Sequence, residues 1–94
     1  MDIAWAAGFY EGEGSVQRNN KTPGSPGVQI AQKDPAPLLW LRERFGGSVR
    51  EYTRNSDGRA YYKWWLSGTR ARGFLFTIFS LLSARRRGQI KECF

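Results

Sequence analysis

The sequence contains no histidine, and this absence excludes more chemistry than any other feature of its composition. Without imidazole there is no histidine general base, no serine–histidine–aspartate triad and no histidine ligand for a metal ion. The only cysteine, Cys93, excludes a disulfide within the chain and a zinc site built from cysteines. An enzyme of this composition has to use carboxylates, lysines, arginines, tyrosines or a metal ion bound through oxygen.

Long apolar runs and acidic residues are also scarce. No stretch is long enough to span a bilayer and no signal-peptide pattern is present, which predicts a cytoplasmic or organellar-matrix protein without a membrane partner. Fifteen lysines and arginines oppose eight acidic residues, so the net charge is +7. This balance favours a polyanionic partner, nucleic acid before membrane, and the 94 residues are predicted to form one domain.

A short helix with two carboxylates at its end is predicted near the N-terminus. Ala4, Gly8 and Gly12 recur every fourth residue, and such a stripe of small residues lets a second helix approach closely. Gly12 and Gly14 flank Glu13 and are expected to supply the positive φ that ends a helix. Glu13 then lies among outward-pointing carbonyls, where an anion is unfavourable unless a cation joins it. Carboxylate and carbonyl oxygens are the ligands that Mg²⁺ or Ca²⁺ accepts.

Alternating and helical spacings succeed one another along the rest of the chain. Strands are predicted at 15–21, 28–33, 48–54 and 59–67, and helices at 35–45 and 69–82, followed by a short helix that ends at Phe94. Asp34 and Thr69 are predicted to cap the second and third helices, and Leu81 to join the apolar face of the third. The segment 22–27 is predicted to be a loop, and Asp57–Gly58 a hairpin turn. The fold class is therefore α+β.

One face of the predicted sheet carries amides, cations and aromatic rings, while Trp64 and Leu66 are assigned to the core side. Glutamine and asparagine can pair with adenine in the major groove, and arginine or lysine with guanine. The plainer interpretation of such polar positions is a solvated sheet face. The residues predicted to face DNA are Gln17, Asn19, Lys21, Gln29, Arg50, Tyr52, Arg54, Lys63 and Trp65.

Residues 6–14, AAGFYEGEG, resemble the LAGLIDADG motif of homing endonucleases in the variant that ends Gly-Glu-Gly-Ser. The predicted order of elements is similar to the αββαββα core of a single-motif subunit of that family. The resemblance implies a saddle of four antiparallel strands in the DNA major groove, one domain over residues 1–94, and motif helices paired at the two-fold axis of a homodimer. It also implies site-specific cleavage of a long, pseudo-palindromic DNA duplex, with no small-molecule substrate.

The resemblance assigns the active-site residues one by one. It implies that Glu13 binds metal through its carboxylate and Gly12 through its carbonyl. Gln32 matches a glutamine near the family's water pocket, although its strand parity differs from that of Gln29. Arg85 matches the basic residue that follows the third helix, and the neighbouring Arg86 is close enough to leave that assignment open.

Further correspondences concern assembly and charge. Ala4, Gly8 and Gly12 are expected at the dimer interface, and Glu11 matches the acid that the family uses mainly structurally near the helix end. A second basic residue that some members carry falls here at Ala36. The resemblance implies Mg²⁺ as cofactor, with Mn²⁺ as a substitute and Ca²⁺ supporting binding without turnover.

Two other interpretations stay open. A non-cleaving nucleic-acid binder of the same fold, such as an RNA maturase or a transcription regulator, is compatible with the alanine at position 36. A basic structural protein without a site leaves the stripe of small residues unexplained. The resemblance leaves the host element open between an intron, an intein and a free-standing gene.

Overall fold

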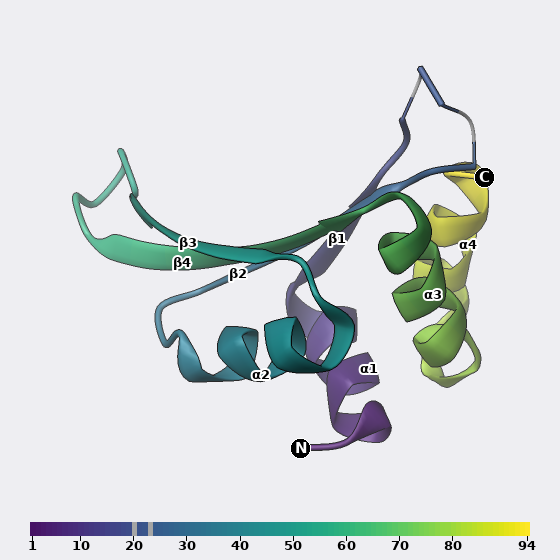
Figure 1. The fold of residues 1–94 in the computed structure, drawn as a ribbon, viewed down its shortest axis with the longest axis horizontal. Coiled ribbons are helices and arrows are strands. Elements are labelled where there is room, and N and C mark those ends of the chain that lie inside the picture. The colour runs from purple at the N-terminus through teal and green to yellow at the C-terminus, as the bar shows by residue number, and fades with distance from the viewer. Residues whose placement is uncertain (20, 23) are drawn as a thin grey trace.

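The computed structural model describes residues 1–19, 21–22 and 24–94 (Figure 1). Positions 20 and 23, which fall in the predicted strand 15–21 and the predicted loop 22–27, lie outside the described residues. The elements are α1 (Ile3–Glu13), β1 (Gly14–Gln17), β2 (Gly27–Gln32), α2 (Ala36–Phe45), β3 (Ser48–Thr53), β4 (Ala60–Ser67), α3 (Gly68–Ile78), the 3₁₀ turn η1 (Phe79–Leu81) and α4 (Ala84–Glu92). This order confirms the predicted α+β fold.

The four strands form one antiparallel sheet in the order β1-β2-β4-β3. Figure 1 shows a curved sheet with the helices packed on one side and the other face open. Because side chains alternate between the two faces of a strand, the register decides which residues point to the helices. Ile30 pairs with Trp64, and Val28 pairs with Leu66, so these four side chains share the covered face.

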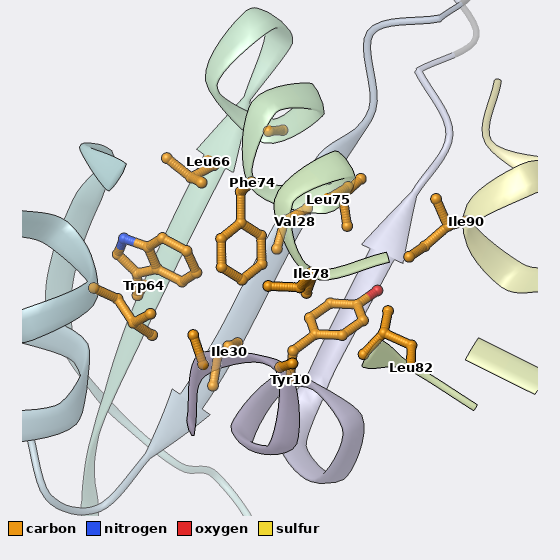
Figure 2. Packing of buried hydrophobic residues seen from close by; sticks show 14 of the residues in the cluster. Tyr10, Val28, Ile30, Trp64, Leu66, Phe74, Leu75, Ile78, Leu82 and Ile90 are labelled. Carbon is orange, nitrogen blue, oxygen red and sulfur yellow. The ribbon is translucent and has the colours of Figure 1, made fainter. Parts of the chain in front are cut away.

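The core lies between this covered face and the helices (Figure 2). Trp64 and Phe74 are fully buried, and their rings meet edge to face with centroids 5.2 Å apart. The indole Nε1 of Trp64 donates a hydrogen bond to the Gly46 carbonyl oxygen at 2.9 Å. The assignment of Trp64 and Leu66 to the core is confirmed.

Several predicted boundaries were wrong by a few residues. Strand β1 ends at Gln17 rather than at position 21. The N-cap of α3 is Ser67 rather than Thr69, because Gly68 takes a positive φ of 62° and turns the chain directly from β4 into the helix. The N-cap of α2 is Pro35 rather than Asp34, although the Asp34 carboxylate accepts a hydrogen bond from the Ala36 amide.

Leu81 was also predicted wrongly, since 56% of it is exposed. The α-helix stops at Ile78 and continues as the 3₁₀ turn η1, which has three residues per turn instead of 3.6. This change of period rotates Leu81 away from the core, whereas Leu82 returns to it.

Gly14 is required for a reason other than the one predicted. Neither Gly12 nor Gly14 has a positive φ, and Gly14 is extended, with φ −82° and ψ 160°. A Cβ at Gly14 would instead collide with the ring of Tyr10. The close approach of this ring to the backbone lets α1 pass into β1 without a connecting residue.

Tyr10 carries an unusual buried polar group. Its ring is fully buried, and among the described residues its hydroxyl has no hydrogen-bond partner. Figure 2 shows the hydroxyl pointing toward the part of the core where Ile90 and Leu82 lie. Burial raises the pKa of Tyr10 to about 12.

The Tyr10→Phe variant should therefore be more stable than the native protein. Removing an unsatisfied buried hydroxyl is expected to raise the free energy of unfolding by about 1 kcal/mol, measured by urea denaturation at neutral pH. The native protein should also lose stability as pH rises from about 10 toward 12, because the unfolded tyrosine ionises before the folded one. The variant should lack this part of the alkaline loss, and a destabilised variant would contradict the prediction.

Candidate nucleic-acid interface and active site

The end of α1 meets the sheet at the point where β1 begins. Glu13 is the last residue of the helix and is exposed, and Gly14 pairs with Ile30 of β2. Strand β2 continues two residues past this pair to Gln32, beyond the part of β2 that pairs with β1. The structure thus places Glu13 at the junction between the helical layer and the sheet.

The cation at the end of α1 is the guanidinium of Arg86. Its Nε donates to the Glu11 carbonyl oxygen at 3.0 Å, and one terminal nitrogen donates to the Gly14 carbonyl oxygen at 2.9 Å. The guanidinium also lies over the Tyr10 ring, 5.6 Å from its centroid. A positive charge at a helix C-terminus is favourable. Arg86 therefore supplies part of the positive charge that we expected a metal ion to supply at this end of α1.

Arg86, rather than Arg85, reaches the candidate site. Arg85 is exposed to solvent, whereas only 13% of the Arg86 side chain is exposed. The same terminal nitrogen of Arg86 also donates to the Gln89 amide oxygen at 3.1 Å. No sequence pattern separates Arg86 from its arginine neighbours, because the choice depends on how α4 packs against α1.

Glu11 joins α1 to the start of α4. Its carboxylate accepts hydrogen bonds from the Ser83 amide at 2.7 Å and the Ser83 hydroxyl at 2.9 Å. The Ser83 hydroxyl in turn accepts a bond from the Arg86 amide and caps α4. The bond from the Ser83 amide is the main cause that lowers the pKa of Glu11, with Arg86 adding to it. These contacts are bonds within the protein that link two helices.

The polar face of the sheet predicted from alternation is open. Arg50 pairs with Lys63, Gln29 with Trp65 and Tyr52 with Tyr61, all on the side opposite to the core. Gln17 lies on the same side in β1, and Arg54 directly follows β3. We call this side the open face. Asn19 and Lys21 are exposed but lie beyond β1, in the connection to β2 rather than in a strand.

Cations and aromatic rings alternate across the open face. The Arg50 guanidinium lies 5.5 Å from the Trp65 ring centroid, and the Lys63 ammonium lies 5.1 Å from that of Tyr52. Trp65 is therefore half-buried beneath an arginine rather than fully exposed. Rings in this position hold the cations near the surface of the open face.

Two shallow hollows line the β1 side of the open face. One, of about 450 Å³, is lined by Gln17, Gln29, Lys63 and Trp65 among others. The second, of about 420 Å³, is lined by Arg18, Asn19 and Lys21 together with Gln17 and neighbouring residues. The hollows bring amide and cationic groups together in a surface that fits base edges and phosphates.

Gln32 does not share the open face. It pairs with Tyr62 at the end of β2, so its parity places it on the side of the sheet that the helices cover. Tyr61 is a residue of the open face that the list of predicted DNA contacts omits. The sequence signal for this position is the two-residue spacing of Tyr61, Lys63 and Trp65, which places all three side chains on one face of the strand.

Within the described ranges, no group of three or more acidic, cysteine or histidine residues is placed to hold a metal ion. In the same part of the chain, no helix is long and apolar enough to cross a membrane.

No protein-family model matches the sequence, and no curated protein matches it. Solved structures do resemble it. The homing endonuclease I-CvuI, in complex with the I-CreI target and Mg, aligns with a TM-score of 0.72 and 24% identity over 95% of this chain and 60% of that one. The homing endonuclease I-TnaI aligns with a TM-score of 0.61 and 25% identity over 97% of this chain and 67% of that one.

A third similar structure is the LAGLIDADG homing endonuclease I-LtrWI bound to target DNA, with a TM-score of 0.68 and 17% identity over 97% of this chain and 34% of that one. The chain spans about three fifths of the length of I-CvuI. It has the fold of the LAGLIDADG homing endonucleases, as the motif at residues 6–14 indicated.

The contacts of Glu11 predict that the stability of the protein falls at acidic pH. The pKa of Glu11 is lower in the folded protein than its ordinary value of 4.5. The ionised Glu11 therefore contributes fully to the free energy of unfolding above pH 4.5, and this contribution is lost as the pH falls through the folded pKa. Glu11→Gln should lower the free energy of unfolding at neutral pH and differ less from the native protein in acid. Denaturation curves at both pH values test this.

Glu43→Gln, at an exposed position of α2, is the matched control. A Glu11→Gln variant with the native stability at neutral pH would show that the bonds to Ser83 do not hold the two helices together.

Proposed function

We propose that the protein is a site-specific, double-stranded DNA endonuclease that acts as a homodimer with a divalent metal ion. The observation that carries this proposal is the junction of α1 with the sheet. There, exposed Glu13 lies at the edge of a sheet whose open face carries Arg50, Arg54 and Lys63. A duplex held on that face has its phosphates close to a carboxylate at the end of a helix.

DNA binding is supported by the charge and the curvature of the open face. The major groove is about 12 Å wide and admits a β-ribbon, whose side chains then reach base edges. Gln17 and Gln29 offer amides for adenine, whereas Arg50 offers a guanidinium for guanine. I-CvuI and I-LtrWI are themselves complexes with DNA, and their fold is the fold of this chain.

Cleavage would be centred on Glu13. Its carboxylate and the Gly12 carbonyl are oxygen donors of the kind that Mg²⁺ prefers, and Mn²⁺ should replace it. One carboxylate is too few for a cation that takes about six oxygen ligands, so water, a DNA phosphate and the second subunit would supply the others. When bound, the ion would neutralise the phosphate and activate a water molecule.

The chain's own residues would shape this site. Arg86, not Arg85, is the basic residue in our proposal, because it binds the carbonyl oxygens of Glu11 and Gly14 and so holds the backbone on both sides of Glu13. Gln32, at the end of β2, is proposed to position water near the scissile phosphate.

Homodimerisation is supported by the exposure of the stripe on α1. Ala4, Gly8 and Gly12 are all exposed, and a Cβ added at either glycine would meet nothing within 4 Å. A second copy of α1 can therefore approach along this stripe. Because Glu13 directly follows the stripe, pairing would bring two Glu13 carboxylates together, one for each DNA strand.

A non-cleaving nucleic-acid binder is the second candidate, and one observation favours it. The Nε and one terminal nitrogen of Arg86 already donate to the Glu11 and Gly14 carbonyls and to Gln89, so these donors are engaged within the protein rather than with a phosphate. With Ala36 at the position of a further basic residue, the cleavage site would have little positive charge of its own.

The Glu13→Gln variant separates these two functions. It should lose cleavage by more than about a hundredfold while its duplex affinity stays equal or rises, because a metal ligand is lost and one anion fewer faces the phosphates. Cleavage is measured with Mg²⁺ or Mn²⁺ on duplexes that the native protein selects from a randomised pool. With Ca²⁺, the native protein should bind without cutting.

Glu43→Gln, remote from α1, should cut at the native rate. Undiminished cutting by Glu13→Gln would remove the proposed site, and a native protein that binds these duplexes without cutting any would favour the non-cleaving binder.

The Gly8→Leu variant tests the dimer. A leucine at the centre of the stripe should keep the two α1 helices apart, giving a monomer in sedimentation equilibrium under conditions where the native protein is a dimer on DNA. Gly73→Leu is the matched control, since Gly73 is also an exposed helical glycine with open space around it, but lies in α3. A native protein that stays monomeric on DNA would refute this mode of assembly.

A further inference from the structure

Three side chains are joined at the far end of the open face, where β3 turns into β4. The Tyr61 hydroxyl donates a hydrogen bond to Asp57 Oδ2 at 3.0 Å and accepts one from a terminal nitrogen of Arg54, also at 3.0 Å. The Arg54 guanidinium lies 4.5 Å from the centroid of the Tyr61 ring. Arg54 is thus held both by the hydroxyl and by the face of the ring.

The turn keeps Asp57 in place. Its other carboxylate oxygen accepts a hydrogen bond from the Arg59 amide at 3.0 Å, and the Arg54 amide donates to the Arg59 carbonyl oxygen at 2.9 Å. The bond from the Arg59 amide is the main cause that lowers the pKa of Asp57, with Tyr61 and Arg54 adding to it. An ionised carboxylate only accepts, so the Tyr61 hydroxyl has to donate to it and leaves its lone pairs for Arg54.

This arrangement differs from the other cation–aromatic pairs of the open face. Within the described residues, Arg50 over Trp65, Lys63 over Tyr52 and Lys33 over Tyr61 make no side-chain hydrogen bond. Arg54 is held by a ring and a hydrogen bond together. Tyr61 is also only 8% exposed, so it is itself well fixed. A long side chain that is ordered before binding loses less conformational entropy in the complex.

The free edge of the guanidinium indicates what it would bind. Arginine has five N–H donors in a planar fork, and the bond to Tyr61 uses one terminal nitrogen. The remaining donors match a pair of acceptors in one plane, which in a duplex means either O6 and N7 of guanine or two phosphate oxygens.

We propose that Tyr61 and Asp57 are positioning residues that hold Arg54 in the orientation in which it binds such an acceptor pair of a DNA duplex. The inference rests on the proposed DNA-binding function and adds to it a pair of residues that act through Arg54. Asp57 accepts the hydrogen bond that orients the Tyr61 hydroxyl, and this hydroxyl accepts the bond that orients Arg54. Arg54 makes the contact with DNA.

The test is a double-mutant cycle between Tyr61→Phe and Arg54→Ala, with duplexes that the native protein selects from a randomised pool. Tyr61→Phe keeps the ring and removes the hydroxyl, and it should weaken binding about three- to tenfold. In the Arg54→Ala background the same change should have almost no further effect, because the residue it positions is absent. Thermal melts confirm that each variant is folded.

The pattern of the loss identifies the acceptor. If Arg54 binds guanine, both single variants should relax the preference at one symmetric pair of base positions. If it binds phosphate, the loss should be equal for all sequences, and Arg54→Ala should reduce the salt slope of log affinity by about one. Asp57→Asn should show a smaller loss of the same type, since asparagine keeps the bond from the Arg59 amide.

Tyr62→Phe is the control, a neighbouring half-buried tyrosine on the covered face. It should bind like the native protein. The proposal is overturned if Tyr61→Phe also binds like the native protein, or if it weakens binding equally with and without Arg54. Native protein that binds no duplex overturns the proposed function as well, whereas normal native binding with an unaffected Tyr61→Phe variant overturns only this inference.

Discussion

The bonds at the C-terminus of α1 connect the first helix, the last helix and the start of the sheet. A helix end leaves carbonyl oxygens without partners, and here Arg86 of α4 binds the carbonyls of Glu11 and Gly14, one at the end of the helix and one at the start of β1. In return, the Glu11 carboxylate accepts hydrogen bonds from the amide and hydroxyl of Ser83, the residue that caps α4. One arginine and one glutamate thus join the first helix, the last helix and the sheet, and Glu13 lies between the two carbonyls that Arg86 holds.

The sheet acquires two different faces from simple alternation. On the covered face, Trp64 and Ile30 pair and pack against α1, α2 and α3. On the open face, two arginines and a lysine, Arg50, Arg54 and Lys63, lie over aromatic rings at distances of 4.5 to 5.5 Å. The hydrophobic core makes the first face rigid, and the cation–aromatic pairs keep charged side chains ordered on the second. A duplex-binding surface benefits from both, since ordered side chains lose less entropy on binding.

The close packing of Tyr10 explains how the proposed catalytic carboxylate is placed. Its ring lies against Gly14 so closely that no side chain fits there, which allows the helix to pass into the strand without a loop. The cost is a buried hydroxyl that has no hydrogen-bond partner in the described part of the chain. Exposed residues on the same helix, Ala4, Gly8 and Gly12, remain available for a second subunit in our proposal.

The sequence alone determined the fold class, the order of the elements and the two faces of the sheet, because periods of 2 and 3.6 residues are local properties. The same local signals failed where contacts between distant segments decide: Thr69 does not cap α3, Leu81 is exposed, and Gly14 is needed for packing rather than for a positive φ. Only the tertiary structure selected Arg86 over Arg85 and joined Tyr61 to Arg54. Neighbouring arginines are equivalent in sequence, and only the packing of α4 against α1 makes one of them reach the helix end.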